Sequence, residues 1–169
     1  EPGVDKGKIQ AEISELQGQL TSIAESASFS GENWLDVNST TSTDTDEKSI
    51  VASFNRDAGG NVSVGVIKID TSKIKLFDAG TNTASAGVGI LDTNYTTAGA
   101  VDANQLTPAA GGFTVGTLNV DGADDAALTG FIKGVDTALK SMTTAASNLG
   151  AAKSRMDIQS EFVSNLRDS

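Results

Sequence analysis

The chain contains no cysteine and no histidine among its 169 residues. Without cysteine it has no disulfide and no thiol nucleophile, and without histidine it lacks the commonest general base and the usual zinc ligands. Aromatic residues make up 5% of the chain and hydrophobic residues 38%, which favours an elongated protein with thin cores. We therefore expect no enzyme activity, no cofactor and no metal site.

Positive charge is also scarce. The chain has twelve Lys and Arg residues and 22 Asp and Glu residues, so its net charge is −10. An acidic chain without a basic patch is a poor candidate for binding nucleic acid or an anionic membrane surface. No apolar run approaches the roughly 20 residues that span a bilayer, and the N-terminus lacks the apolar core of a signal peptide. We expect neither a nucleic-acid partner nor a membrane partner.

A long amphipathic stretch near the C-terminus, residues 131–166, contains no proline. Its apolar residues recur at intervals that place them on one side of a helix. Such a helix of about 36 residues would be about 54 Å long, which is longer than a small domain is wide, so it needs a second helix beside it. The predicted packing residues are Val135, Leu139, Met142, Leu149 and Met156.

A second helical pattern lies at the other end of the chain. Its apolar residues are spaced alternately four and three apart, as in a heptad seam; they are Ile9, Ile13, Leu16, Leu20 and Ile23. Asp5 is a suitable N-cap, and the small residues of 26–31 predict the end of the helix. We expect the two helices to pack antiparallel, as a coiled-coil-like rod.

The residues between the helices are β-rich. Ser49–Asn55 and Asn61–Asp70 alternate in hydrophobicity around a short polar loop and predict a hairpin. Shorter strands are expected at 74–77, 88–91 and 113–120, and Asp121 or Asp124 is the expected cap of the last helix. The predicted fold class is α+β: a helical rod of residues 1–35 and 128–169 with a β-rich insert, residues 36–127, at one end.

Two groups of acidic residues could suggest a metal. Asp44, Asp46 and Glu47 resemble a calcium loop, but the glycine and the final glutamate that such a loop requires are missing. The second group, Asp121, Asp124 and Asp125, is explained by capping of the last helix. Neither group predicts a metal site.

Two blocks of sequence are more specific. The first reads IQAEI at residues 9–13 and continues with Phe29-Ser30-Gly31 and Leu35; the second reads SNLGA at residues 147–151 and continues with Arg155-Met156 and Asn165-Leu166. In order and polarity, these blocks resemble the helical ends of bacterial flagellins. The short insert, rich in Ala and Thr, is similar to that of alpha-proteobacterial flagellins.

This resemblance implies an extracellular structural subunit of the flagellar filament, which serves swimming motility. The subunit would be exported without a cleaved signal peptide and would polymerise with copies of itself by packing of its rod helices. Its partners would include the flagellar export and cap machinery. The insert would form a hairpin at the rod tip and a small outer domain. The chain is expected to be a core fragment without both terminal segments, unable to polymerise alone.

The resemblance also bears on innate immune recognition. Glu12 matches a position at which the family contacts an innate immune receptor, whereas Glu15 and Leu16 differ from the enteric pattern.

Other functions stay open at this point. A hook-associated protein or a type III needle-tip protein would also have helical ends and a variable insert. A surface adhesin or binding module would use the insert as its recognition surface. A hydrolase using paired aspartates is the enzyme alternative.

Overall fold

The computed structural model describes residues 2–27, 33–38, 47–56, 59, 61–78, 88–105 and 109–167. Its elements, in chain order, are α1 (Pro2–Ser26), β1 (Asp36–Val37), β2 (Glu47–Arg56), β3 (Val62–Asp70), the short 3-10 helix η1 (Thr71–Lys73), β4 (Phe77–Asp78) and α2 (Asp125–Arg167). The predicted combination of helices and strands is confirmed. The Asp124 carboxylate accepts a hydrogen bond from the Ala127 amide at 2.7 Å, so the predicted cap of the last helix is confirmed. The predicted cap of the first helix is wrong, because α1 begins at Pro2 and Asp5 lies within its first turn.

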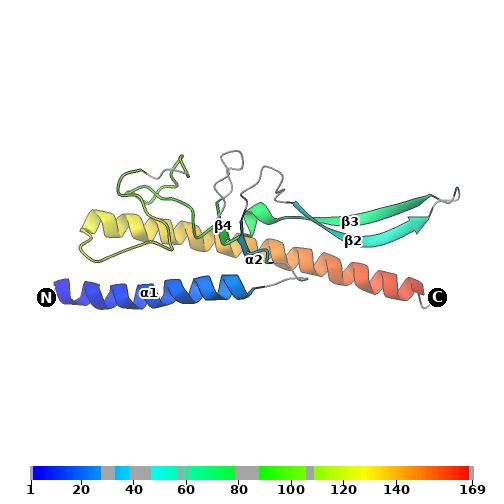
Figure 1. Cartoon of the computed structure of the whole chain (residues 1–169), viewed down its shortest axis with the longest axis horizontal. Coiled ribbons are helices and arrows are strands. Elements are labelled where there is room, and N and C mark those ends of the chain that lie inside the picture. The colour runs from blue at the N-terminus through cyan, green and yellow to red at the C-terminus, as the bar shows by residue number, and fades with distance from the viewer. Residues whose placement is uncertain are drawn as a thin grey trace.

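The two long helices lie side by side and run in the same direction (Figure 1). Their N-terminal ends are held together, because the Lys6 ammonium donates to the carbonyl of Ala123 at 2.6 Å. The expected antiparallel arrangement is therefore wrong. The physical reason is the path of the chain: after α1 it passes through the strands and then returns along the helices through residues 88–124, so α2 begins at the same end as α1.

Strands β2 and β3 form the predicted antiparallel hairpin, in which Glu47 is opposite Asp70 and the register shifts once, between Val51 and Ser53. Residues of β3 alternate as expected: Ile67 and Ile69 are buried. The hairpin lies along the second half of α2 (Figure 1). It is therefore placed beside a helix and not beyond the end of the helices, because its buried face packs against α2.

The shorter strands differ from expectation. Of the segment 74–77 only Phe77 enters a strand, β4, which pairs in parallel with β1. The segments 88–91 and 113–120 form turns, apart from an isolated bridge between Tyr95 and Phe113. In the second of these segments, the amide of Thr117 donates to the side-chain oxygen of Thr114 at 3.1 Å, and the amide of Thr114 donates to that of Thr117 at 3.1 Å. Such local hydrogen bonds between side chain and backbone compete with strand pairing.

Two separate hydrophobic cores support this arrangement. The first joins the hairpin to the second half of α2, and its buried members are Trp34, Ile67, Ile69, Ile74, Ala145 and Ala152. The second joins the return segment to both helices, and its buried members are Tyr95, Phe113, Leu118 and Val120. In the second core Phe113 stacks on Tyr95 at 5.5 Å and meets Phe131 edge to face at 4.7 Å. The helices are thus joined largely through the segment between Tyr95 and Ala123.

Candidate assembly surface

The residues of α1 that contact the rest of the molecule recur every three or four positions along the helix. Its buried and half-buried residues are Lys6, Gln10, Ile13, Gln17, Leu20 and Ala24. Ile13 packs against the second core beside Val135. Of the α1 residues predicted to pack, the structure therefore places Ile13 and Leu20 on the contacting side.

Polar side chains hold this side of α1 to the return segment. The Gln10 side-chain oxygen accepts the amide hydrogen of Val120 at 2.8 Å. The Gln17 side-chain nitrogen donates to the carbonyl of Val115 at 2.8 Å and to that of Leu118 at 3.2 Å. The apolar pattern of the sequence did not predict these contacts, because glutamine is not counted in an apolar seam. The spacing of seven between the two glutamines is the signal that could have revealed them.

The contacting side of α2 is built from small residues. Gly134, Ala138, Ala145 and Ala152 are buried along it. A Cβ atom on Gly134 would lie 2.7 Å from the Phe113 ring, so the absence of a side chain lets the aromatic core reach the helix. The larger predicted residues Val135, Met142, Leu149 and Met156 are half-buried beside these small ones.

The remaining predicted packing residues are largely exposed. On α1 these are Ile9, Leu16 and Ile23, with 48%, 58% and 61% of their surface exposed. On α2, Ile132 and Leu139 are exposed at 70% and 56%. Members of each set are seven residues apart, the repeat with which helices pack on one another. We call these two sets the outer rows.

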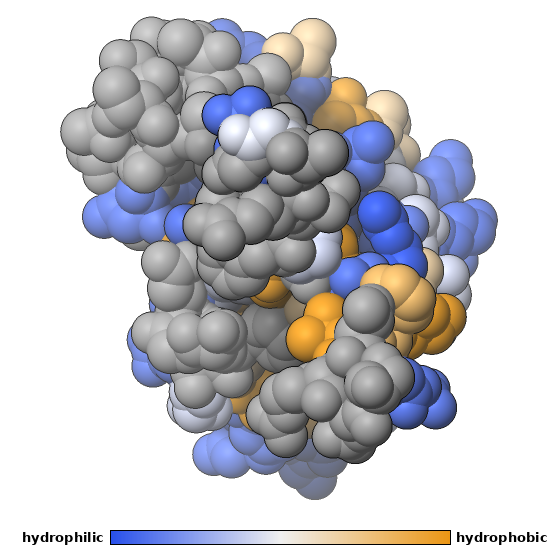
Figure 2. All heavy atoms as spheres, turned by 90° about the vertical axis from the view of Figure 1, so that its right-hand side faces the viewer, coloured by the Kyte–Doolittle hydropathy of each residue, from blue (hydrophilic) through white to orange (hydrophobic). Residues whose placement is uncertain are grey.

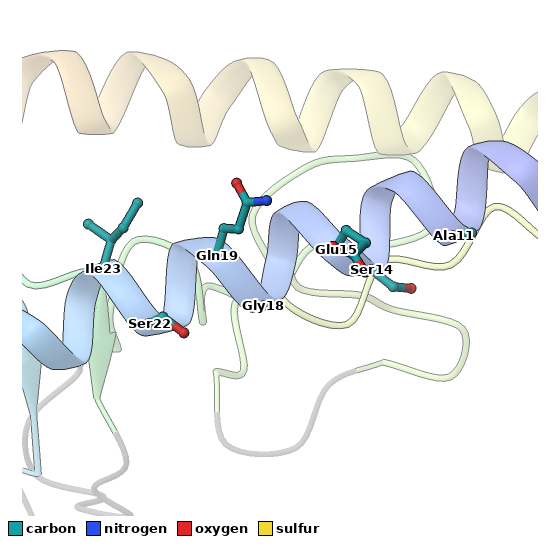
Figure 3. A pocket seen from close by; sticks show the side chains of 7 residues that line it. All are labelled: Ala11, Ser14, Glu15, Gly18, Gln19, Ser22 and Ile23. Atoms are coloured by element: carbon teal, nitrogen blue, oxygen red, sulfur yellow. The ribbon is translucent and has the colours of Figure 1, made fainter.

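A shallow groove runs along α1 next to its outer row (Figure 3). In Figure 3, Gln19 and Ile23 point toward α2, whereas Ser14 and Ser22 point away from it. A Cβ atom on Gly18 would meet no atom within 4 Å. All of the lining comes from α1: Ala11, Ser14, Glu15, Gly18, Gln19, Ser22 and Ile23. Small residues of this kind allow a further helix to approach closely.

Hydrophobic residues are also exposed where α2 ends. Figure 2 views the molecule from that end and shows hydrophobic patches among hydrophilic residues. The exposed hydrophobic residues of this part of α2 are Ile158, Phe162 and Val163. A second groove lies between the hairpin and α2, and Ile50, Met156 and Val163 are among its lining residues. Apolar surface of this extent is typical of protein–protein contacts.

Two pairs of opposite charges are exposed on α2. Lys140 contacts Asp136 at 2.6 Å, and Lys153 contacts Asp157 at 2.8 Å, each pair four residues apart on α2. Hydrogen bonding and the charge of Asp157 raise the pKa of Lys153. Exposed pairs of this kind contribute little to stability, because water screens them. Contacts made through the helices are therefore governed mainly by their apolar rows.

In the part of the chain that the structure describes, no three acidic side chains are grouped so that they could hold a metal ion. Asp44 and Asp46 lie outside the described residues. Among the described residues, no helix is both long and apolar enough to cross a membrane.

Comparison with known proteins reveals relatives along the whole chain, although no family model matches it. It is 43% identical to flagellin C of Rhizobium meliloti strain 1021, over 99% of the chain and 53% of that protein. It is 34% identical to flagellin A of Rhizobium meliloti, over 100% of the chain and 62% of that protein. It is 32% identical to a flagellin of Brucella melitensis, over 98% of the chain and 45% of that protein. The chain thus spans about half the length of the curated relatives it matches.

Proposed function

Since the chain is a relative of the bacterial flagellins, we propose that it belongs to a structural subunit of the flagellar filament, a protein of motility and not an enzyme. The single observation that carries the assembly part of this proposal is the pair of outer rows. Two helices that were complete by themselves would turn their heptad-spaced aliphatic residues toward each other. Here Ile9, Leu16 and Ile23 stay exposed instead, which suits a subunit whose helices pack against further helices.

In this proposal the predicted packing residues have two roles. Those on the contacting sides, among them Ile13, Leu20 and Val135, stabilise the subunit itself. Those of the outer rows, among them Leu16 and Leu139, pack against other helices of the filament. The heptad spacing of the outer rows supports coiled-coil-like packing, with both helices of this chain running in the same direction.

The domain organisation follows from the same division. Residues 1–35 and 128–169 would form the helical rod, and residues 36–127 would form the insert that faces away from the filament axis. The hairpin would be the part of the insert that lies against the rod. Support comes from the first hydrophobic core, in which Ile67 and Ile69 pack with Ala145 and Ala152 of α2.

The partners of the assembled protein would be copies of itself and, during export and growth, the flagellar export and cap machinery. The site of action would be extracellular. Glu12 is exposed on α1, so it would be open to an innate immune receptor in a free subunit.

Labelling of cells tests this function directly. Antibodies raised against the chain should decorate the filaments of the bacterium that encodes it along their whole length, as seen by immuno-electron microscopy. Labelling confined to the hook–filament junction would indicate a hook-associated protein instead. Labelling of the cell surface without filaments would indicate an adhesin. Either of these results would overturn the proposal.

A further inference from the structure

A buried pair of opposite charges lies near the junction of β1 and β4, and the proposed filament contacts do not use it. The Lys75 ammonium is 2.8 Å from an Asp78 carboxylate oxygen. The side chain of Lys75 is 0% exposed and that of Asp78 is 1% exposed. A third acidic residue, Asp92, accepts the amide hydrogen of Asp78 at 2.8 Å through its own carboxylate.

The backbone around this pair is fixed on both sides. The carbonyl of Lys75 accepts the amide hydrogen of Ile90 at 3.0 Å, and the carbonyl of Leu76 accepts that of Leu91 at 2.9 Å. Ile74 precedes Lys75 in the chain and Leu91 is bonded to the backbone of Leu76; each of the two is 2% exposed. The amine and the carboxyl group are thus held in contact away from water, which turns a reaction between them into a unimolecular one.

Burial removes the water that would solvate the ammonium and the carboxylate. This loss of hydration disfavours both charges, and the attraction between them opposes it. Transfer of one proton from Lys75 to Asp78 produces a neutral amine next to a neutral carboxylic acid. An amine in that state is a nucleophile.

We propose that Lys75 and Asp78 become joined by an intramolecular isopeptide bond. The nitrogen lone pair of Lys75 attacks the side-chain carboxyl carbon of Asp78, and a nitrogen–carbon bond forms. The carbon–oxygen bond to the hydroxyl group then breaks. The hydroxyl leaves as water with a proton that comes from the attacking nitrogen. The net change is one amide formed and one water released, so no oxidant, cofactor or activating co-reactant is needed.

Asp92 is placed to assist this step as a positioning and proton-carrying residue. Burial is the largest influence on its carboxyl group and raises its pKa; repulsion by Asp78 and Asp36 acts in the same direction, and the hydrogen bond from Asp78 opposes them. A carboxyl group that stays protonated more readily can pass a proton to a leaving hydroxyl group. Among the described residues, the charged groups that act on it are Asp36 from β1 and Asp78 from β4.

The bond would fix a turn that holds two segments of the chain together. Leu35, directly before β1, accepts the amide hydrogens of Leu76 and Phe77 through its carbonyl. Both of these residues lie inside the ring that the new amide would close. Because the chain has no cysteine, this bond would give it a covalent cross-link that a disulfide cannot supply.

Intact mass spectrometry of the denatured, purified chain tests the proposal. The measured mass should be lower than the sequence mass by one water molecule. A mass equal to that of the sequence would show that Lys75 and Asp78 form an ion pair only, and would overturn the proposal. Neither result depends on whether the chain forms filaments, so this test is separate from that of the proposed function.

Peptide mapping locates the bond. Trypsin does not cleave after a lysine whose side chain is acylated, so the digest should contain residues 74–133 as one peptide that lacks one water. Cleavage after Lys75 would contradict the proposal. This measurement uses the unaltered chain and holds even if a variant at Lys75 fails to fold.

Variants provide matched controls. Lys75→Arg keeps the positive charge but should show the full sequence mass. Lys73→Arg, which changes an exposed lysine two residues away that is paired with Asp70, should keep the deficit of one water. Asp92→Asn keeps an oxygen that can accept the amide hydrogen of Asp78, so its circular dichroism should match that of the unaltered chain. The isopeptide bond should form more slowly in this variant. An unchanged rate in this variant would remove Asp92 from the mechanism.

Discussion

The carbonyl oxygen of Thr97 occupies the space that a Cβ atom on Gly130 would need. Gly99, two residues beyond Thr97, has a φ of +77° and faces the same turn of α2, so that a Cβ atom there would strike the carbonyl of Gly130. Backbone therefore meets backbone between the return segment and α2. This contact sets the distance at which the second aromatic core lies against the helix.

Replacing Gly130 by alanine tests that contact. The added methyl group has no space, so the turn at Thr97 must move away from α2. Inserting such a group into a closely packed site lowers the free energy of unfolding by about 1–3 kcal/mol. Urea unfolding followed by circular dichroism measures this change.

The matched control is Gly150→Ala, also within α2. A Cβ atom on Gly150 would meet no atom within 4 Å, so only the helix propensity changes. Alanine should raise the free energy of unfolding there by about 0.5–1 kcal/mol. If both variants were stabilised alike, the close approach of Thr97 to α2 would be refuted.

The Gln17 side chain offers a second test, because it joins α1 to the return segment. Gln17→Ala leaves the carbonyls of Val115 and Leu118 without this donor, and an unsatisfied buried polar group costs about 1–3 kcal/mol. Thermal or urea unfolding should show a loss within that range. Gln19→Ala, on the exposed side of the same helix, should change stability by less than about 0.5 kcal/mol. Equal losses in both variants would mean that the hydrogen bonds of Gln17 do not matter.

Much of the fold could be predicted from local patterns. The spacing of apolar residues identified both helices, and the alternation in residues 49–55 and 61–70 identified the hairpin. The direction of one helix relative to the other could not be predicted, because the heptad spacing of apolar residues is the same in parallel and in antiparallel pairs of helices. Direction was decided by the return segment, whose turns between Asn94 and Ala123 carry weak hydrophobic patterning.

The side on which each helix packs was predicted only in part. Apolar spacing finds the large residues, whereas α1 also packs through Gln10 and Gln17, and α2 through Ala138 and Ala145. Amides that bond to backbone carbonyls and alanines that permit close approach are both invisible to a search for large apolar residues. This explains why Leu16 and Leu139 lie outside the contact although they continue the seam.

Asp102 makes part of the stability depend on pH. Its carboxylate accepts the amide hydrogens of Asn104 at 2.9 Å and Ala109 at 2.8 Å. These two hydrogen bonds lower the pKa of Asp102, the bond from Asn104 most strongly. A carboxyl group with a lowered pKa stabilises the folded state above its unfolded pKa of about 3.9, and this contribution is lost as the pH falls through the folded value.

Unfolding measured between neutral and strongly acidic pH should therefore show stability falling below about pH 4. Asp102→Asn should be less stable at neutral pH and should lose part of that acid dependence, because the amide offers one acceptor oxygen where the carboxylate offers two. Glu15→Gln, at an exposed position of α1, serves as the comparison and should retain the acid dependence. The same acid dependence in Asp102→Asn as in the unaltered chain would exclude Asp102 as its source.

The outer row of α1 yields the prediction closest to the proposed function. Leu16 is 58% exposed and Ile13 is half-buried against the second core, although the two residues are three positions apart in the same apolar seam. If the outer row packs against other subunits, the purified chain should associate weakly at high concentration through its exposed aliphatic residues. Leu16→Ser removes such a residue without opening a cavity, so sedimentation velocity should shift toward the monomer while the unfolding curve stays within about 0.5 kcal/mol of the original.

Ile13→Ser should behave in the opposite way. It removes apolar contacts with the core residues beside Val135 and introduces a hydroxyl group there, so the free energy of unfolding should fall by about 2–4 kcal/mol. Association measured under conditions in which Ile13→Ser stays folded should be unchanged. Leu16 and Ile13 are both aliphatic residues of the same seam. A difference between the two variants therefore reports whether the side chain is exposed or packed against the core. A chain that sediments as a strict monomer at high concentration, with or without Leu16, would show that the outer row of α1 has no affinity for a second copy.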